Sequence, residues 1–219
     1  MAIFKNVKSI FFDYDGTLHD SIHIYAPAFK KAYAYLVQNG LAKEKKWTYQ
    51  EIAYWLGFNS KEMWDRFMPD LDESEKSICS TVIGSEMLTQ MKSYQAVLYP
   101  HALNTLKYLK QKGYQLVFIS NCRIYYRDMA REQFGLEDYF EEMVCSEEYD
   151  FIPKHAILNK IMNKYTSDKV IIGDRIQDIE AGKRNGIYTI GCTYGFNSGN
   201  ELEEADVLID DICDLKKYL

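Results

Sequence analysis

Two aspartates spaced two residues apart, Asp13 and Asp15, are the first residues of this sequence with an arrangement suited to catalysis. They directly follow the apolar run 10–12 and precede a turn at Gly16, a pattern that predicts a buried strand. Side chains on an extended segment alternate between two sides, so both carboxylates leave the strand end on the same side, roughly 6–7 Å apart. Two buried anions need a positive partner, and a hard cation such as Mg²⁺ prefers oxygen ligands. The alternative is an exposed strand end with two solvated acids.

The segment after this strand predicts helices only, over about 75 residues. Apolar residues recur there at helical spacing, and capping residues, glycines and prolines delimit helices; the expected helices cover 22–37, 48–57, 60–68 and 72–91. Such a segment is far too long for an ordinary connection between two strands. We therefore predict two domains, an α/β core formed by residues 1–18 and 94–219 and an inserted helical domain over residues 19–93.

From Pro100 onwards, predicted strands and helices alternate. The expected strands are 115–119, 143–145, 169–172, 188–192 and 205–209, and the run at 143–145 has the weakest pattern. This alternation predicts an α/β fold with a Rossmann-like parallel sheet that carries helices on both faces.

Polar residues follow several of these predicted strands: Ser120, Asn121, Lys154, Asp174 and Asp178. In an open parallel sheet, ligands bind beyond the carboxyl ends of the strands, where the two aspartates of the first strand also lie. The acids suit a metal ion, the lysine suits an anionic substrate, and the hydroxyl and turn amides donate hydrogen bonds. This set favours phosphoryl transfer, in which positioning and charge stabilisation provide most of the catalysis.

Four segments resemble, in order, the four motifs of the haloacid dehalogenase superfamily: FFDYDGTLHDS, ISN, PKH and GDRIQDIEAG. The helical insertion resembles the cap of its phosphoglycolate phosphatase-like and β-phosphoglucomutase-like members. The resemblance covers essentially the whole chain, and its first and fourth motifs are the specific ones. It implies a Mg²⁺-dependent phosphatase that hydrolyses a small-molecule phosphate monoester through an aspartyl-phosphate.

The resemblance also implies a catalytic role for each residue that matches a motif. By position, Asp13 is the nucleophile and Asp15 the general acid/base, while Ser120 binds the transferring phosphoryl group and Lys154 stabilises its charge. The Mg²⁺ ligands that it implies are Asp13, the backbone carbonyl of Asp15 and Asp174, with Asp178 in a supporting position.

The residues expected to bind substrate lie in both predicted domains. Gly16, Thr17 and Asn121 are expected to hold the phosphate group with turn amides and polar side chains. Lys61 falls where related caps place a specificity loop, so it is expected either to meet a substrate anion or to be an exposed lysine on a helix–helix turn.

The two catalytic aspartates have opposite requirements. Asp13 is expected to need no activation, because a carboxyl of pKa ~4 is ionised at neutral pH. Asp15 has to hold a proton for the leaving oxygen, and an apolar lid that excludes water favours that form. Dehalogenases and phosphonatases of the superfamily typically lack an acid at the position of Asp15, so the resemblance favours phosphate ester chemistry.

Four further residues are open to two interpretations. His19 and His23 flank the start of the helical insertion and are expected to pack or to serve a hinge, since Asp15 already fills the acid/base role. Arg123 is either a substrate contact or a surface arginine at a helix start. Arg175 stands where members of the superfamily often have a small polar residue.

Composition excludes several other functions. The net charge of −6 argues against a nucleic-acid partner, and the five scattered cysteines form no C-x-x-C pair, which indicates reduced thiols. There is no signal-peptide pattern and no run of roughly 20 apolar residues. We expect a cytoplasmic enzyme without membrane or nucleic-acid partners, monomeric or homodimeric, that acts on a small phosphorylated metabolite.

Three alternatives remain at this point. A β-phosphoglucomutase-like phosphomutase would use the same scaffold with a sugar phosphate as acceptor. A signalling receiver domain is about half as long and carries its acceptor aspartate after a middle strand. A catalytically silent phosphate-binding protein is the third.

Overall fold

The computed structural model describes residues 4–165 and 167–219, and the chain divides into two compact units. One unit joins the N-terminal segment up to Asp20 with the chain from Leu98 onwards, and the other runs from Ser21 to Val97. The prediction placed these boundaries after residues 18 and 93. We call the two parts the sheet unit and the helical unit.

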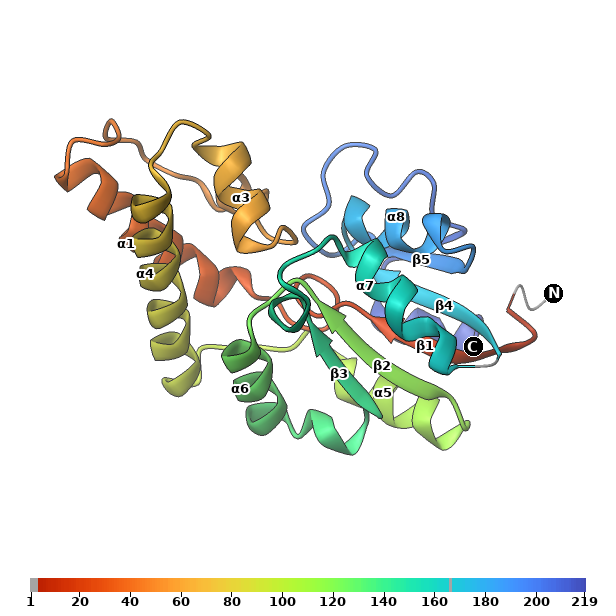
Figure 1. Ribbon diagram of the computed structural model, residues 1–219. Helices are drawn as coiled ribbons and strands as arrows, with labels where there is room; N and C mark the ends of the chain where they lie inside the picture. Colours follow the sequence, from red (N-terminus) through yellow and green to blue (C-terminus); the bar gives the residue numbers. More distant parts are fainter. Residues whose placement is uncertain (1–3, 166) are drawn as a thin grey trace. The chain divides into compact units, whose positions relative to one another are not determined.

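The sheet unit contains a six-stranded sheet in the order β3-β2-β1-β4-β5-β6 (Figure 1). Its strands are β1 (Val7–Phe12), β2 (Gln115–Ser120), β3 (Glu142–Cys145), β4 (Asp168–Gly173), β5 (Tyr188–Cys192) and β6 (Val207–Ile209). All neighbouring strands pair in parallel. The predicted α/β fold class is therefore confirmed, and the short run with the weakest pattern is a strand at the sheet edge.

Helices cover both faces of this sheet: α5 (Ala102–Gln111), α6 (Ile124–Phe134), α7 (Lys154–Ile161) and α8 (Ile176–Arg184). The chain steps from β1 outward to β2 and β3, then returns to β4 on the other side of β1. Because such crossovers are right-handed, α5 and α6 lie on one face, while α7 and α8 lie side by side on the other (Figure 1). The reversal of direction at β1 and β4 is the point at which ligands bind in folds of this kind.

Fully buried strand residues form the core beneath α7 and α8. The cluster comprises Phe11, Val117, Ile119, Val144 and Ile171 from the sheet, with Ile157, Leu158, Ile161 and Ala181 from the two helices. Parallel strands with helices on both faces read as continuous apolar runs, which is why the sequence pattern located them.

The helical unit consists of α1 (Ile22–Gln38), α2 (Tyr49–Ala53), α3 (Ser60–Phe67) and α4 (Glu73–Lys92). Long helices α1 and α4 pack against each other. Pro27 lies inside α1, although an interior proline removes one helical hydrogen bond. Helix α3 starts one residue earlier than a Ser60 cap would place it, because Asn59 is the N-cap and accepts a hydrogen bond from the Glu62 amide.

Candidate active site

The predicted site residues after β1 and β4 are neighbours because these strands are paired. Phe12 lies opposite Ile172 in the register, and the Asp13 amide donates a hydrogen bond to the Ile172 carbonyl at 2.9 Å. The pairing thus continues to the first aspartate, and Asp174 leaves the neighbouring strand two residues beyond Ile172. The sheet therefore delivers both carboxylates to the same rim.

Three buried carboxylates and one buried ammonium form the centre of this rim. Asp13, Asp174 and Asp178 each offer an oxygen, and these oxygens lie within 4.8 Å of one another. Lys154 Nζ donates to Asp13 Oδ1 at 2.5 Å and to Asp178 Oδ1 at 2.6 Å. Four side chains that the sequence predicted to meet are thus in contact, although up to 165 residues separate them in the chain.

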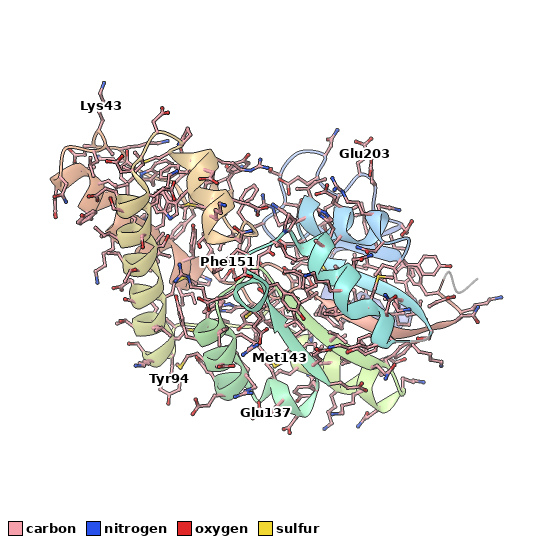
Figure 2. The ribbon with its side chains drawn as sticks, viewed as in Figure 1. Lys43, Tyr94, Glu137, Met143, Phe151 and Glu203 are labelled. Atoms are coloured by element: carbon pink, nitrogen blue, oxygen red, sulfur yellow. The ribbon has the colours of Figure 1, made fainter. Side chains whose placement is uncertain are left out.

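The loop between β3 and α7 brings Lys154 to the cluster. Asp150 and Phe151, the latter labelled in Figure 2, both have left-handed backbone conformations, with φ of 53° and 56°. Successive left-handed non-glycine residues are strained. They turn the chain sharply before Pro153, which is the N-cap of α7, so that Lys154 becomes the first residue of this helix.

Two glycines make room for the carboxylates. A Cβ at Gly16 would lie 2.1 Å from Asp174 Oδ2, and φ at this position is +85°. A Cβ at Gly173 would lie 2.1 Å from the carboxyl carbon of Asp178. Real Cβ atoms do not approach so closely, so the cluster in this form requires glycine at both positions.

Burial dominates the electrostatics of the cluster. It raises the pKa of Asp13 to about 7, with a further contribution from the Asp178 charge, and Lys154 only partly opposes this shift. Burial and the charge of Asp13 also raise the pKa of Asp174 well above its usual range. Burial alone would lower the pKa of Lys154, but Asp13 and Asp178 together raise it, so this lysine stays charged. The prediction that Asp13 needs no activation overlooked this burial: without a further positive charge, Asp13 is not fully ionised at neutral pH.

The cluster fits a divalent cation. Oδ1 of Asp174 is buried and has no hydrogen-bond partner among the described residues, while Oδ2 accepts from the Phe196 amide at 2.5 Å. Three carboxylates against one ammonium leave a formal charge of −2 when all are ionised. A hard dication with oxygen ligands would satisfy the orphaned oxygen and neutralise this charge.

Asp15 lies outside this cluster and is held by two aromatic rings. The hydroxyl of Tyr126, on α6, donates to Asp15 Oδ1 at 2.7 Å. His19 Nδ1 lies 2.9 Å from that hydroxyl and 3.3 Å from Asp15 Oδ1. His19 was expected to pack or to serve a hinge, and the structure gives it a polar contact with this aspartate. Sequence reasoning missed Tyr126 entirely, because nothing in the local pattern of α6 marks it.

The residues expected to bind the substrate lie at the strand ends and in the helical unit. Ser120 is the last residue of β2 and is buried, and Asn121 follows it beyond the sheet. Thr17 Oγ1 lies 3.5 Å from Asp13 Oδ2, at the outer limit of a hydrogen bond. Lys61 is exposed on α3 of the helical unit.

The two arginines have structural partners. Arg123 is the N-cap of α6, and its guanidinium lies 5.8 Å from the centre of the Phe151 ring. Arg175 is buried and pairs with Glu201 at 2.7 Å. Its backbone amide also donates to Asp178 Oδ2 at 3.1 Å. The large residue at position 175 is thus accommodated by an acid from the β5–β6 connection, which the sequence pattern did not indicate.

Comparison with known proteins adds to this geometry. The sequence model of the haloacid dehalogenase-like hydrolase family matches residues 10–192. The chain belongs to this family. The matched range spans both units and includes the buried residues Asp13, Lys154, Asp174, Arg175 and Asp178.

The relatives of this haloacid dehalogenase-like hydrolase include phosphatases that match it over nearly the whole chain. The phosphoglycolate phosphatase of Psychrobacter arcticus is 28% identical over 96% of this chain and 94% of its own. That of Aliivibrio fischeri is 25% identical over 99% and 96%. The crystal structure of a predicted phosphatase from Clostridium acetobutylicum has a TM-score of 0.81 at 23% identity, over 96% of this chain and 97% of that one. The predictions of the family and of a phosphohydrolase enzyme are thus confirmed.

The structure also bears on the predictions about membrane partners and cysteines of this haloacid dehalogenase-like hydrolase. None of the helices within residues 4–165 and 167–219 has the length and apolar character needed to cross a bilayer. All five cysteines are free thiols. The cytoplasmic location, the oligomeric state and the absence of a nucleic-acid partner stay predictions.

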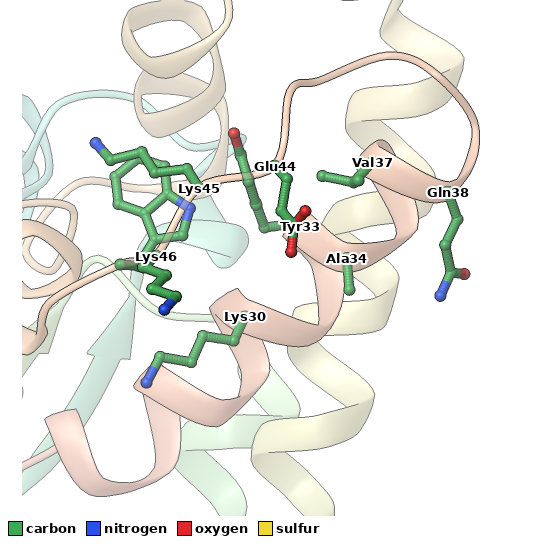
Figure 3. Close-up of a pocket in the computed structure, with 9 residues that line it drawn as sticks. Lys30, Tyr33, Ala34, Val37, Gln38, Glu44, Lys45 and Lys46 are labelled. Atoms are coloured by element: carbon green, nitrogen blue, oxygen red, sulfur yellow. The ribbon is translucent and has the colours of Figure 1, made fainter.

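A cavity of about 450 Å³ lies within the helical unit of this hydrolase (Figure 3). Lysines and aromatic residues surround it: Lys30, Lys45, Lys46, Tyr33 and Trp47 are among its lining residues. Lys45 Nζ sits 3.7 Å above the centre of the Trp47 ring. None of the predicted site residues is among those that line this cavity.

Proposed function

We propose that this hydrolase is a Mg²⁺-dependent phosphatase that hydrolyses a small phosphate monoester through a phosphoaspartyl intermediate on Asp13. The observation that carries the proposal is the contact of Asp13, Asp178 and Lys154 beside the partnerless oxygen of Asp174. Lys154 thus donates a hydrogen bond to Asp13, the proposed nucleophile. Both lie beside the carboxylates that would hold the dication.

The cation would be held by Asp13, Asp174 and the backbone carbonyl of Asp15, with Asp178 in support. When bound, Mg²⁺ neutralises charge on the phosphoryl oxygens and favours the ionised form of the carboxylates. Lys154 contributes the second positive charge and orients Asp13 through its hydrogen bond.

The remaining residues carry out the covalent step and its reversal. An Asp13 oxygen forms the bond to phosphorus while the ester oxygen leaves with its electron pair and takes the proton of Asp15. Ser120 and Asn121, with the hydroxyl of Thr17, hold the phosphoryl group. The amides of Gly16 and Thr17, which were expected to take part, donate instead to the carbonyls of His19 at 2.9 Å and Tyr14 at 3.2 Å. Asp15, now ionised, takes a proton from the water that attacks phosphorus, which frees Asp13 and releases phosphate.

The names of the relatives make phosphoglycolate the first substrate to test. We further propose that residues 19–93 form a helical cap domain and that Lys61 contributes to selection of the ester. The small substrate and the reduced cysteines are in keeping with a cytoplasmic enzyme.

Phosphate release from 2-phosphoglycolate, sugar 1-phosphates and p-nitrophenyl phosphate, with Mg²⁺ or with excess chelator, tests this proposal. We expect release only with Mg²⁺, and loss of turnover by at least about 1,000-fold in Asp13→Asn with folding intact. Asp138→Asn is the matched control, because Asp138 is exposed and remote from the cluster in the fold. Full activity in chelator, or normal release by Asp13→Asn, would refute the proposal; isomerisation of a sugar phosphate without release would indicate the phosphomutase.

A further inference from the structure

Asp15 is fixed by contacts that the catalytic scheme has not used. Its Oδ1 accepts a hydrogen bond of 2.7 Å from Tyr126, a residue 111 positions away in the chain. His19 Nδ1 approaches the same hydroxyl to 2.9 Å. All three residues belong to the sheet unit, so this arrangement does not depend on the helical unit.

The direction of these hydrogen bonds is determined by their chemistry. Because the Tyr126 hydroxyl has one hydrogen and donates it to Asp15, its oxygen can only accept from His19. His19 therefore carries its proton on Nδ1, and its Nε2 is buried without a hydrogen-bond partner among the described residues. A chain of donors thus runs from His19 through Tyr126 and ends on one oxygen of Asp15.

Packing holds both donors in place. Tyr126 is 3% exposed and His19 is fully buried. The ring of Tyr14 stacks on His19 at 4.9 Å between centroids and meets Tyr126 edge-on at 5.8 Å. Neither donor can turn away without disturbing this aromatic contact, so the orientation of the Asp15 carboxyl group is set by its surroundings.

We propose that Tyr126 and His19 are positioning residues that occupy Oδ1 of Asp15 and thereby assign proton transfer to Oδ2. This inference rests on the proposed function. During formation of the phosphoaspartate, the ester oxygen keeps the electron pair of its broken bond to phosphorus and receives the proton from Oδ2. Oδ1 accepts from Tyr126 throughout, so the carboxyl group cannot rotate its proton away from the leaving group.

The dependence of rate on the leaving group separates this role from a structural one. Phenyl phosphate and p-nitrophenyl phosphate have similar shapes, but nitrophenolate departs without a proton far more easily than phenolate does. The value of kcat/KM reports the step that forms the phosphoaspartate and releases the leaving group, before water attacks. In that step, a residue that positions the proton of Asp15 affects the first ester and spares the second, whereas a loss of folded protein lowers both kcat/KM values equally.

Tyr126→Phe removes the hydroxyl and keeps the ring. We expect kcat/KM for phenyl phosphate to fall by about 10- to 100-fold, since general acid catalysis contributes a factor of this order or more. The kcat/KM for p-nitrophenyl phosphate is expected to stay within about threefold. Tyr125→Phe is the matched control, because the hydroxyl that donates to Asp15 belongs to Tyr126 and not to this neighbour, and it should leave both rates unchanged.

A second pair of variants covers the case in which Tyr126→Phe does not fold. Asn in place of His19 can offer an amide donor near the Nδ1 position, whereas Leu cannot. We expect His19→Asn to keep most of the phenyl phosphate rate and His19→Leu to lose it selectively. Equal effects of these changes on the two esters, or no effect, would overturn the inference alone. A wild-type protein inactive on both esters would overturn the proposed function and, with it, this inference.

Discussion

Removal of divalent cations should make the stability of this protein fall steeply as pH rises. In the cluster without a cation, Asp13 has a pKa of about 7 because of burial and the Asp178 charge, against 3.8 when it is free in water. The folded state therefore binds an additional proton between about pH 4 and pH 7. Stability decreases with rising pH wherever the folded state binds more protons than the unfolded state.

The size of this effect follows from the shift in pKa. A rise from 3.8 to about 7 corresponds to about 4 kcal/mol of destabilisation once Asp13 is forced to ionise. About 3 kcal/mol of this cost appears between pH 5 and pH 8, with the remainder below pH 5. Asp174 shifts in the same direction, so this figure describes one residue of the cluster only.

Urea unfolding of chelator-treated protein at pH 5, 6, 7 and 8 measures the effect. With a slope of about 3 kcal/mol per molar urea, the midpoint should fall by about 1 M between the extremes. Circular dichroism is the appropriate signal, because all three tryptophans, Trp47, Trp55 and Trp64, lie in the helical unit and report on that unit. Saturating Mg²⁺ should remove most of the pH dependence.

Asp13→Asn provides the control for other titrating groups. This variant keeps the shape of the side chain and removes its charge, so its metal-free stability should depend on pH less than that of the wild type by about 3 kcal/mol over the same interval. Equal slopes for the two proteins, or a metal-free wild type whose stability is constant from pH 5 to pH 8, would refute the electrostatic account of the cluster.

Two further predictions concern space and substrate choice. Gly16→Ala should lower the free energy of unfolding in urea by at least about 2 kcal/mol more than Gly113→Ala does. Both glycines have φ of +85°, but only a Cβ at position 16 would collide with Asp174. Equal losses of stability would contradict the close approach of Gly16 to Asp174. Lys61→Ala should change the relative kcat/KM values across the ester panel by about tenfold. Lys92 is another exposed lysine of the helical unit, and Lys92→Ala should not change them. An unchanged profile for Lys61→Ala would mean that Lys61 is an ordinary surface lysine.

The residues of the acidic cluster were predictable from sequence because each follows a strand with a clear pattern. Asp13 and Asp174 come directly after apolar runs that pair in the sheet, and a parallel sheet places such ends at one rim. Lys154 was harder, since β3 is short and lies at the sheet edge. Its place at the rim was predicted from the weak strand pattern at 143–145, and its catalytic role from the resemblance of the PKH segment to a known motif.

The residues that adjust the site were not predictable, because they meet through tertiary packing alone. Tyr126 lies on an ordinary amphipathic helix, and its contact with Asp15 spans 111 positions of sequence. Glu201 pairs with Arg175 from an irregular connection that carries no periodic pattern. Hydrophobic periodicity locates elements, but it does not identify which polar groups meet once those elements have packed.

The pKa of Asp13 shows why residue type alone does not determine reactivity. A nucleophilic carboxylate has to be ionised, yet burial beside Asp178 favours its protonated form, and Lys154 supplies only one positive charge, which it shares between both acids. If Asp13 is the nucleophile that we propose, the charge balance of the cluster therefore calls for a second cation, independently of any family resemblance. The same balance implies that binding of the dication increases both nucleophilicity and stability, because each depends on ionisation of the same buried carboxyl groups.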